Sequence, residues 1–198
     1  QGEDDTAKTE HYDVLLTAMV MRLRQLFRDD SLPFLNVQLP RWIAAGDEDK
    51  HDWARLRLAQ ARAASALQPG GLAILLDCGE FDNIHPTDKR TPGERLCDVA
   101  LRVVYGMDAP ESPRALGKYT QGDTLVVTLS APVLRRETGE LLLEIAGEDG
   151  AYHPVQSVTL AGAEMRLRSV AVLHPAKVRY AYVNWGKVSL FGLSLIHI

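Results

Sequence analysis

The stretch LLDCGEFDNIHP, residues 75–86, gives the clearest indication of both the fold and the candidate site of this chain. Its first residues continue an apolar run, Leu72–Leu76, that is typical of a buried strand. The run ends in a loop that carries Asp82 and, three residues later, His85. Reactive groups of α/β proteins gather at the carboxyl ends of parallel strands, so this loop is a candidate site. Asp82 could fix the tautomer and direction of the His85 imidazole, which would then act as a general base.

The segments around this stretch alternate between helix and strand patterns. Three segments repeat apolar residues at three- and four-residue spacing, the period of an amphipathic helix, and two short apolar runs have the length of buried parallel strands. The helices are expected over residues 12–27, 53–67 and 91–105, and the strands over residues 32–39 and 72–76. Thr91 is the expected N-cap of the third helix, with Pro92 at its first position. This order predicts an α/β fold with a three-layer, parallel-sheet portion.

The composition changes after about residue 107, where prolines become frequent and the apolar runs become short and strand-like. Such runs, separated by turns, predict a small antiparallel β-sandwich. The expected organisation is an α/β domain over residues 1–107, a linker over residues 108–114 and a sandwich domain over residues 115–198. The last ten residues, Ser189–Ile198, fit neither pattern.

The composition also narrows the possible partners. The 198 residues carry a formal net charge of -4 without a basic stripe, so nucleic acid and anionic membrane surfaces are poor candidates. No apolar run reaches the roughly 18 residues that a membrane-spanning helix needs. The two cysteines and six histidines lack metal-ligand spacing, so a metal centre is not expected. The oligomeric state is left open.

Four segments of the chain, taken together and in order, match a known pattern. They are Gln1–Glu3; Leu32–Leu35 with Val37–Pro40; Asp82–Pro86 with Lys89 and Gly93–Leu96; and Glu144–Gly147 with Val178–Ala181. The third is the most specific, because it combines Asp-x-x-His-Pro with a downstream Gly-Glu-Arg-Leu. On these segments the chain resembles the carbohydrate O-acetylesterases of the SGNH-hydrolase superfamily, and within them the bacterial sialate O-acetylesterases.

The resemblance implies a fold, a reaction and a set of site residues. The fold would be SGNH- or flavodoxin-like, and the reaction would be hydrolysis of acetyl esters on sialic acid without a cofactor. His85 would be the general base and later the general acid, and Asp82 its orienting partner. Gln1 and Gly2 would form part of the oxyanion hole. The substrate would be an O-acetylated sugar, and the protein would be periplasmic or secreted.

The serine nucleophile of this family has no counterpart in the chain. In the family it lies in a Gly-Gln-Ser-Asn type motif upstream of the position that matches Gln1, and no serine here has that context. The chain opens on Gln1 with neither an initiator Met nor a strand before the first helix. We therefore expect it to be the C-terminal portion of the enzyme and to be inactive by itself. Asp5 also departs from the family, where an asparagine is common.

Three other interpretations stay open at this point. The same catalytic groups could deacetylate xylan or another polysaccharide, whereas a cation facing the pocket, such as Arg41 or Arg90, would favour a carboxylated sugar. The chain could be a non-catalytic carbohydrate-binding fragment. Asp82 and His85 could form only a structural ion pair. Glu3 either hydrogen-bonds near the site or is a solvated acid, and it has no assigned role.

Overall fold

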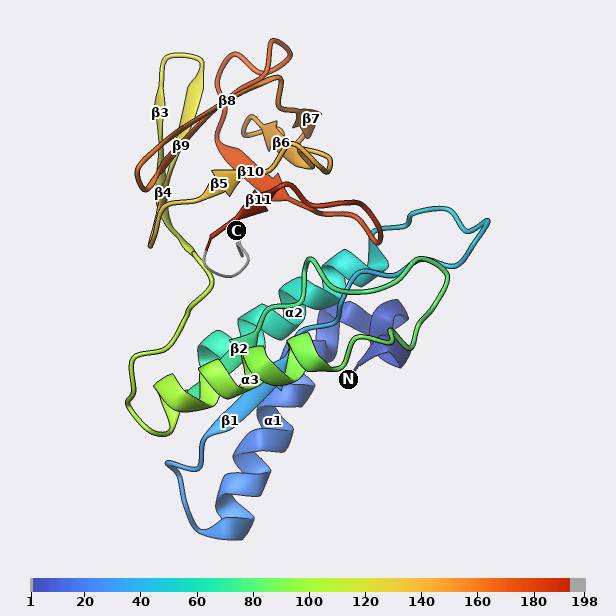
Figure 1. Ribbon diagram of the computed structural model, residues 1–198, viewed down its shortest axis with the longest axis vertical. Coiled ribbons are helices and arrows are strands. Elements are labelled where there is room, and N and C mark those ends of the chain that lie inside the picture. Colours follow the sequence, from blue (N-terminus) through green and yellow to red (C-terminus); the bar gives the residue numbers. More distant parts are fainter. Residues whose placement is uncertain (1, 193–198) are drawn as a thin grey trace. The chain divides into compact units, whose positions relative to one another are not determined.

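The computed structural model describes residues 2–192, and the chain forms two compact units. The first unit extends to Glu111 and also includes Val183–Trp185, which we call the returning segment because it comes from the C-terminal part of the chain. The second unit comprises Ser112–Tyr182 and continues from Gly186. Figure 1 labels the helices and strands of both units.

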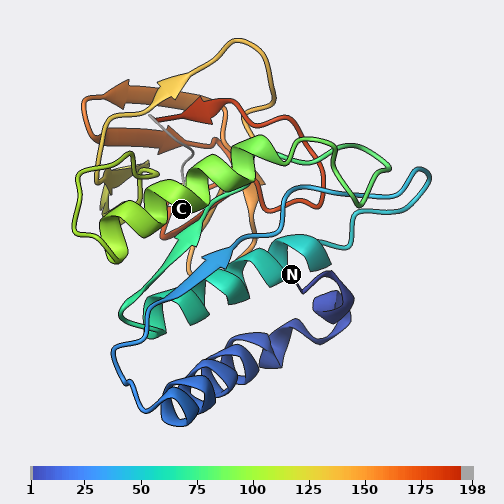
Figure 2. The ribbon, with the colours of Figure 1, turned by 60° about the horizontal axis from the view of Figure 1, so that its bottom comes forward.

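Helices predominate in the described part of the first unit. Its elements are η1 (Glu3–Lys8, a 3-10 helix), α1 (Thr9–Phe27), β1 (Phe34–Val37), α2 (Asp52–Ala66), β2 (Gly70–Ala73) and α3 (Arg90–Val103). The two strands are parallel, with Phe34 opposite Gly70 and Val37 opposite Ala73. Helix α3 packs on one face of this pair and α2 on the other, and α1 packs against α2 (Figure 2).

An apolar cluster lies beside the carboxyl end of β1. Leu56 of α2 is fully buried, Trp53 of the same helix is 4% exposed, and Leu39 follows β1. Tyr12 and Trp42 pack against these residues, and the ring centroids of Trp42 and Trp53 are 5.0 Å apart. Burial of these large apolar side chains fixes α2 against the segment that follows β1.

The second unit is built from antiparallel sheets. Its strands are β3 (Ala115–Gln121), β4 (Thr124–Leu129), β5 (Leu134–Arg135), β6 (Leu143–Ala146), β7 (His153–Pro154), β8 (Ser157–Ala161), β9 (Glu164–Arg168), β10 (Lys177–Tyr180) and β11 (Leu190–Phe191). They form sheets of order β3-β4-β9-β8, β10-β6-β7 and β11-β5. Three consecutive residues of β4, Leu125–Val127, are at most 1% exposed, so the core of this unit lies around β4.

This arrangement corrects the predicted fold class. The prediction of a three-layer, parallel-sheet α/β portion of the SGNH- or flavodoxin-like type, followed by a sandwich, is wrong for this chain. Among residues 2–192, parallel strand pairing is limited to β1 and β2, and the nine other strands lie in small antiparallel sheets. The fold is therefore β-rich. The physical reason is that burial alone does not extend a sheet: Ile74–Leu76 are as buried as β2, yet the ladder between β1 and β2 ends at Ala73.

Two other predictions concern the limits of the chain's parts. The domain limits inferred from the sequence, 1–107 and 115–198, stay a prediction. Of the irregular segment Ser189–Ile198, residues Leu190–Phe191 form β11, whereas residues 193–198 lie outside the described residues.

Candidate active site

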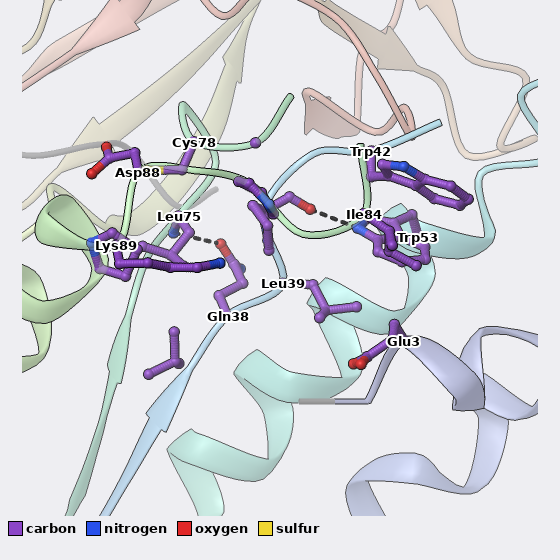
Figure 3. Close-up of a pocket in the computed structure, with 15 residues that line it drawn as sticks. Glu3, Gln38, Leu39, Trp42, Trp53, Leu75, Cys78, Ile84, Asp88 and Lys89 are labelled. Carbon is purple, nitrogen blue, oxygen red and sulfur yellow. Dashed lines mark hydrogen bonds between the residues drawn. The ribbon is translucent and has the colours of Figure 1, made fainter. Parts of the chain in front are cut away.

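A cavity of about 230 Å³ lies in the first unit, where the segments after β1 and β2 meet the start of α3 (Figure 3). Most of its wall is apolar and includes Leu39, Trp42, Trp53, Ile84 and Pro86. Its polar side chains are Glu3 at the start of η1, Gln38 after β1, and Asp88 with Lys89 before α3. A mainly apolar cavity with a few polar groups is the usual form of a small-molecule site.

The loop that carries Asp82 and His85 borders this cavity. Ile84 and Pro86, the two neighbours of His85 in the chain, both line it. The backbone N–H of His85 donates to Asn83 Oδ1 at 3.0 Å, which shapes the turn before the histidine. The His85 imidazole makes no hydrogen bond to any residue in the described range 2–192. It is therefore available to a substrate or to a catalytic partner.

Glu80 closes this loop through its carboxylate. Its Oε1 accepts hydrogen bonds from the Thr87 hydroxyl at 2.5 Å and from the Thr87 N–H at 2.6 Å. Its Oε2 accepts one from Asn83 Nδ2 at 2.6 Å. These bonds favour the ionised form and lower the pKa of the Glu80 carboxyl. One carboxylate thus ties together both ends of the segment that holds Asp82 and His85.

Asp82 is anchored to the segment after β1. Its backbone is left-handed, with φ 57°, a conformation that aspartate adopts more readily than most residues. Its N–H donates to the Ile43 carbonyl at 3.0 Å, and its Oδ1 accepts from Ala45 N at 2.8 Å. Within the described residues its Oδ2 makes no hydrogen bond. The structure therefore brings Asp82 and His85 onto one loop without a hydrogen bond between them.

Glu3 is a second carboxylate near His85. Hydrogen bonds from the N–H groups of Glu3 itself and of Gly2 lower the pKa of the Glu3 carboxyl, and the charge of His85 acts in the same direction. No role was predicted for Glu3, although it belongs to the Gln-Gly-Glu segment. Its place in the cavity wall makes it a candidate functional residue.

The predicted oxyanion residues stay a prediction. Gln1 lies outside the described residues. Gly2 has φ 138°, and a Cβ atom there would come within 2.9 Å of the Tyr12 ring, so glycine is required at this position. The Gly2 N–H donates to Glu3 Oε2 at 2.9 Å. It is a backbone donor beside the cavity that is paired with a carboxylate in this structure.

Asp88 and Lys89 line the cavity beside α3. Asp88 Oδ1 accepts from the N–H groups of Arg90 and Thr91, both at 3.0 Å, so Asp88 rather than the predicted Thr91 provides the capping oxygen of α3. The Lys89 side chain extends toward Gln38 (Figure 3). Neither arginine suggested by the sequence lines the cavity: Arg41 is 7% exposed, and Arg90 forms an exposed ion pair with Glu94.

Cys78 also lines the cavity, but its thiol is protonated at neutral pH. Burial, together with the charge of Asp77, raises the pKa of Cys78 to about 12. Because the thiolate is the nucleophilic form, Cys78 does not act as a nucleophile under ordinary conditions. The described lining of the cavity contains no serine or threonine.

Residues 77–87, which follow β2 and carry Asp82 and His85, form the loop that we call the site loop, and two contacts fix its start. Arg95 of α3 donates to both carboxylate oxygens of Asp77, at 2.6 and 2.7 Å, and to the Ile74 carbonyl at 2.7 Å. Gly79 has φ 105°, and a Cβ atom there would overlap the Arg41 carbonyl oxygen. The loop after β2 thus approaches the segment after β1 at a distance that only glycine permits.

Across residues 2–192, no group of three or more His, Cys, Asp or Glu side chains is arranged to hold a metal ion. In the same range, no helix has both the length and the apolar character needed to cross a membrane.

The chain is similar to a solved structure, that of XAC1771, a carbohydrate acetylesterase from Xanthomonas citri. The sequence identity is 32% and the TM-score is 0.80. The similarity covers 90% of this chain and 43% of that chain, so this chain spans less than half the length of the protein it matches. No family model and no curated protein sequence matches the chain. The neighbour supports the coarser part of the resemblance, to carbohydrate esterases.

Proposed function

We propose that this chain carries the histidine and the aspartate of a carbohydrate O-acetylesterase that uses a Ser-His-Asp mechanism. One observation carries the proposal: the Asp82–His85 loop borders an apolar cavity in a chain that is similar, over 90% of its length, to a carbohydrate acetylesterase. An exposed imidazole at the rim of such a cavity suits a base that must reach both a nucleophile and a leaving group.

In this mechanism His85 removes the proton from a serine hydroxyl while the serine oxygen attacks the acetyl carbonyl carbon. The tetrahedral intermediate then breaks its bond to the sugar oxygen, which takes the proton from His85. Water then gives a proton to His85 and attacks the acetyl-serine. The second tetrahedral intermediate breaks its bond to the serine oxygen, which takes that proton back from His85 as acetate is released. Asp82 Oδ2 accepts the other imidazole N–H and fixes the tautomer, while Oδ1 stays bound to Ala45 N.

We assign the serine to residues outside this chain. No serine is among the described residues that line the cavity, and the chain spans 43% of the acetylesterase that it matches. We assign the oxyanion donors to Gln1 and Gly2. For this role the Gly2 N–H turns from Glu3 Oε2 to the acetyl oxygen, where a backbone donor stabilises the developing negative charge.

We propose a sialic acid as the sugar. Lys89 supports this choice, because its ammonium group is a cation in the cavity wall and can pair with the carboxylate of the sugar. Glu3 and Asp88 also line the cavity, and Lys89 is the cation of its described lining. Neutral acetylated xylan offers Lys89 no such partner.

The experiment uses the complete protein that contains this chain. Release of acetate is measured from an O-acetylated sialic acid, from acetylxylan and from an activated acetate ester. We expect turnover of the sialic acid ester that the His85→Ala substitution abolishes. Binding of the sugar without release of acetate would identify a carbohydrate-binding protein instead. Preferential turnover of acetylxylan would show that the substrate is acetylxylan and not a sialic acid ester.

Lys89→Met tests the sugar carboxylate separately. It should raise KM for the sialic acid ester by about 10- to 150-fold, the value of one charged hydrogen bond of roughly 1.5–3 kcal/mol, and leave turnover of the activated acetate ester unchanged. Lys50→Met is the matched control, because Lys50 is exposed in the same unit and does not line the cavity. Equal effects of the two substitutions would refute the role of Lys89.

A further inference from the structure

Asn184, in the returning segment, is buried and makes four hydrogen bonds to the segment between Trp42 and Trp53. It is 6% exposed. Its Oδ1 accepts from Trp53 N at 3.0 Å, and its Nδ2 donates to Asp52 Oδ1 at 2.6 Å. Its backbone N–H donates to Asp49 Oδ2 at 2.8 Å, and its carbonyl accepts from Trp42 N at 2.9 Å. These bonds span more than 130 residues of sequence and use both the side chain and the backbone.

The segment Arg41–Ile43 lies between Asn184 and the site loop. The Trp42 N–H points to the Asn184 carbonyl. The neighbouring groups point the other way: Arg41 N donates to the Cys78 carbonyl at 3.1 Å, and the Ile43 carbonyl accepts from Asp82 N at 3.0 Å. This alternation is that of an extended strand with a partner on each side. Displacement of this segment therefore moves the backbone to which Asp82 is bonded.

The rest of the returning segment contacts the same region. The Val183 carbonyl accepts from Arg57 Nη2 at 2.7 Å. The Trp185 ring lies edge-on to Phe81, with centroids 5.8 Å apart, and the Arg41 guanidinium lies 4.9 Å from the centroid of the Trp185 ring. Phe81 immediately precedes Asp82. The returning segment thus touches both the site loop and the segment that anchors it.

We propose that Asn184 is a positioning residue for the esterase, acting through residues 41–45 to hold Asp82 in place. The proposal rests on the proposed function, because it assigns Asp82 to the orientation of His85. Asn184 touches no reacting atom in this role. It fixes the Trp42 backbone and the start of α2, and through them the Ile43 carbonyl and Ala45 N–H that hold Asp82.

The chemistry of the Asn184 amide determines the variants. Asn184→Ala removes the side-chain bonds to Trp53 and Asp52, and leaves the buried Trp53 N–H with Asp52 Oδ1, at 3.1 Å, in place of two acceptors. Asn184→Asp keeps the acceptor for Trp53 but places a second carboxylate against Asp52. In the exchange variant Asn184→Asp with Asp52→Asn, the donor and the acceptor trade places, so the contact and the net charge are restored.

The test measures two quantities in the complete protein: amide hydrogen exchange in residues 42–45 and 80–87, and kcat with KM for the acetyl ester. Asn184→Ala should speed exchange at Ala45 and Asp82 by about tenfold. It should lower kcat by roughly 10- to 100-fold, with KM changed less than about threefold, because misplacement of a catalytic group mainly affects turnover. The exchange variant should recover most of this loss, whereas Asn184→Asp alone should not.

Val20→Ala serves as the matched control for destabilisation. Val20 is 1% exposed on α1, so its truncation lowers the stability of the first unit without touching the site loop. If it speeds exchange at Ala45 and Asp82 and lowers kcat as much as Asn184→Ala does, Asn184 is merely structural. Exchange at these two amides that Asn184→Ala leaves unchanged would also overturn the proposal.

The background variant Asp82→Asn separates a route through Asp82 from a general effect. If Asn184 acts through Asp82, then adding Asn184→Ala to the Asp82→Asn protein should lower kcat less than about threefold. A loss as large as in the wild-type background would contradict this route. If the wild-type protein shows no turnover, the proposed function fails, and hydrogen exchange alone then decides whether Asn184 holds Asp82.

Discussion

The Asp82–His85 loop and the returning segment Val183–Trp185 belong to the same unit but differ in every physical respect. The loop is exposed, and most of its hydrogen bonds join residues within seven positions of each other in the sequence. Some polar atoms of its side chains make no hydrogen bond within the described residues. Asn184 is buried, and both its backbone and its side chain make hydrogen bonds. The partners in these bonds are more than 130 positions away in the sequence. The loop has free groups for chemistry, whereas the backbone and the side-chain amide of Asn184 are engaged in hydrogen bonds.

Reactivity and position are therefore provided by separate parts of the chain. A catalytic imidazole must be left free to exchange protons, so its own loop cannot bind it tightly. The precision of the site then depends on a buried scaffold whose hydrogen bonds are complete. We therefore expect changes in the loop to affect chemistry alone, and changes in its support to affect both chemistry and stability.

The largest effect is expected for His85→Ala in the complete protein. Loss of the base should lower kcat by roughly 10³- to 10⁶-fold, because the members of such a triad act as a unit. Thermal unfolding should be unchanged, since the exposed ring has no hydrogen bond within the described residues. His11→Ala, at an exposed position of α1, is the control and should be fully active. A His85→Ala protein of normal activity would mean that the loop is not catalytic.

The next effect is expected for Asp82→Asn. Asparagine tolerates the left-handed backbone and can still accept the Ala45 N–H, so the loop should keep its shape and the protein its melting temperature. The wrong imidazole tautomer should lower kcat by roughly 10²- to 10⁴-fold.

Glu3→Gln is the matched variant, because the charge of His85 acts on the Glu3 carboxyl. Its loss of kcat should be clearly smaller than that of Asp82→Asn. The opposite order, measured with the same acetyl ester, would transfer the orienting role from Asp82 to Glu3.

The sequence predicted the helices better than the sheets, for a physical reason. Helices α1, α2 and α3 begin within three residues of their predicted starts, because the apolar period of a helix is set by local geometry. Strand β3 was missed because all its residues are exposed and it has no apolar alternation. The fold class was wrong because strand pairing depends on neighbours distant in the sequence.

The same distinction applies to the candidate site. The Asp-x-x-His-Pro motif is local, so it pointed to the loop that borders the cavity. Asn184 carries no local signal, because its four partners are brought to it only by folding. The capping oxygen of α3 was assigned to Thr91 instead of Asp88 because both residue types favour caps, and only the backbone decides between them.

A moderate effect is expected from loss of the Arg95–Asp77 contact, which supports the start of the loop. Arg95→Gln removes the paired bonds to Asp77 and the bond to the Ile74 carbonyl, all partly buried, and should lower the free energy of unfolding by about 1–3 kcal/mol. We expect kcat to fall less than about tenfold, since Asp82 keeps its own anchors. Chemical denaturation measures the first value. Arg90→Gln, which breaks only an exposed pair with Glu94, is the control and should change neither.

The smallest effect is expected from the Glu80 carboxylate, and it depends on pH. Hydrogen bonds from Thr87 and Asn83 lower the pKa of Glu80 in the folded protein. The closure of the loop by Glu80 is therefore fully present above the ordinary glutamate pKa of about 4.3 and is lost as the pH falls through the lowered value. Between pH 5 and 8, roughly, the wild-type loop should not respond to pH through this group.

The Thr87 amide resonance should follow the titration of Glu80, with a midpoint below the ordinary glutamate value. Glu80→Gln should remove that transition while lowering kcat less than about threefold. A midpoint at or above the ordinary value would show that Glu80 does not close the loop, and a large loss of kcat would place Glu80 with Asn184 among the supports of Asp82.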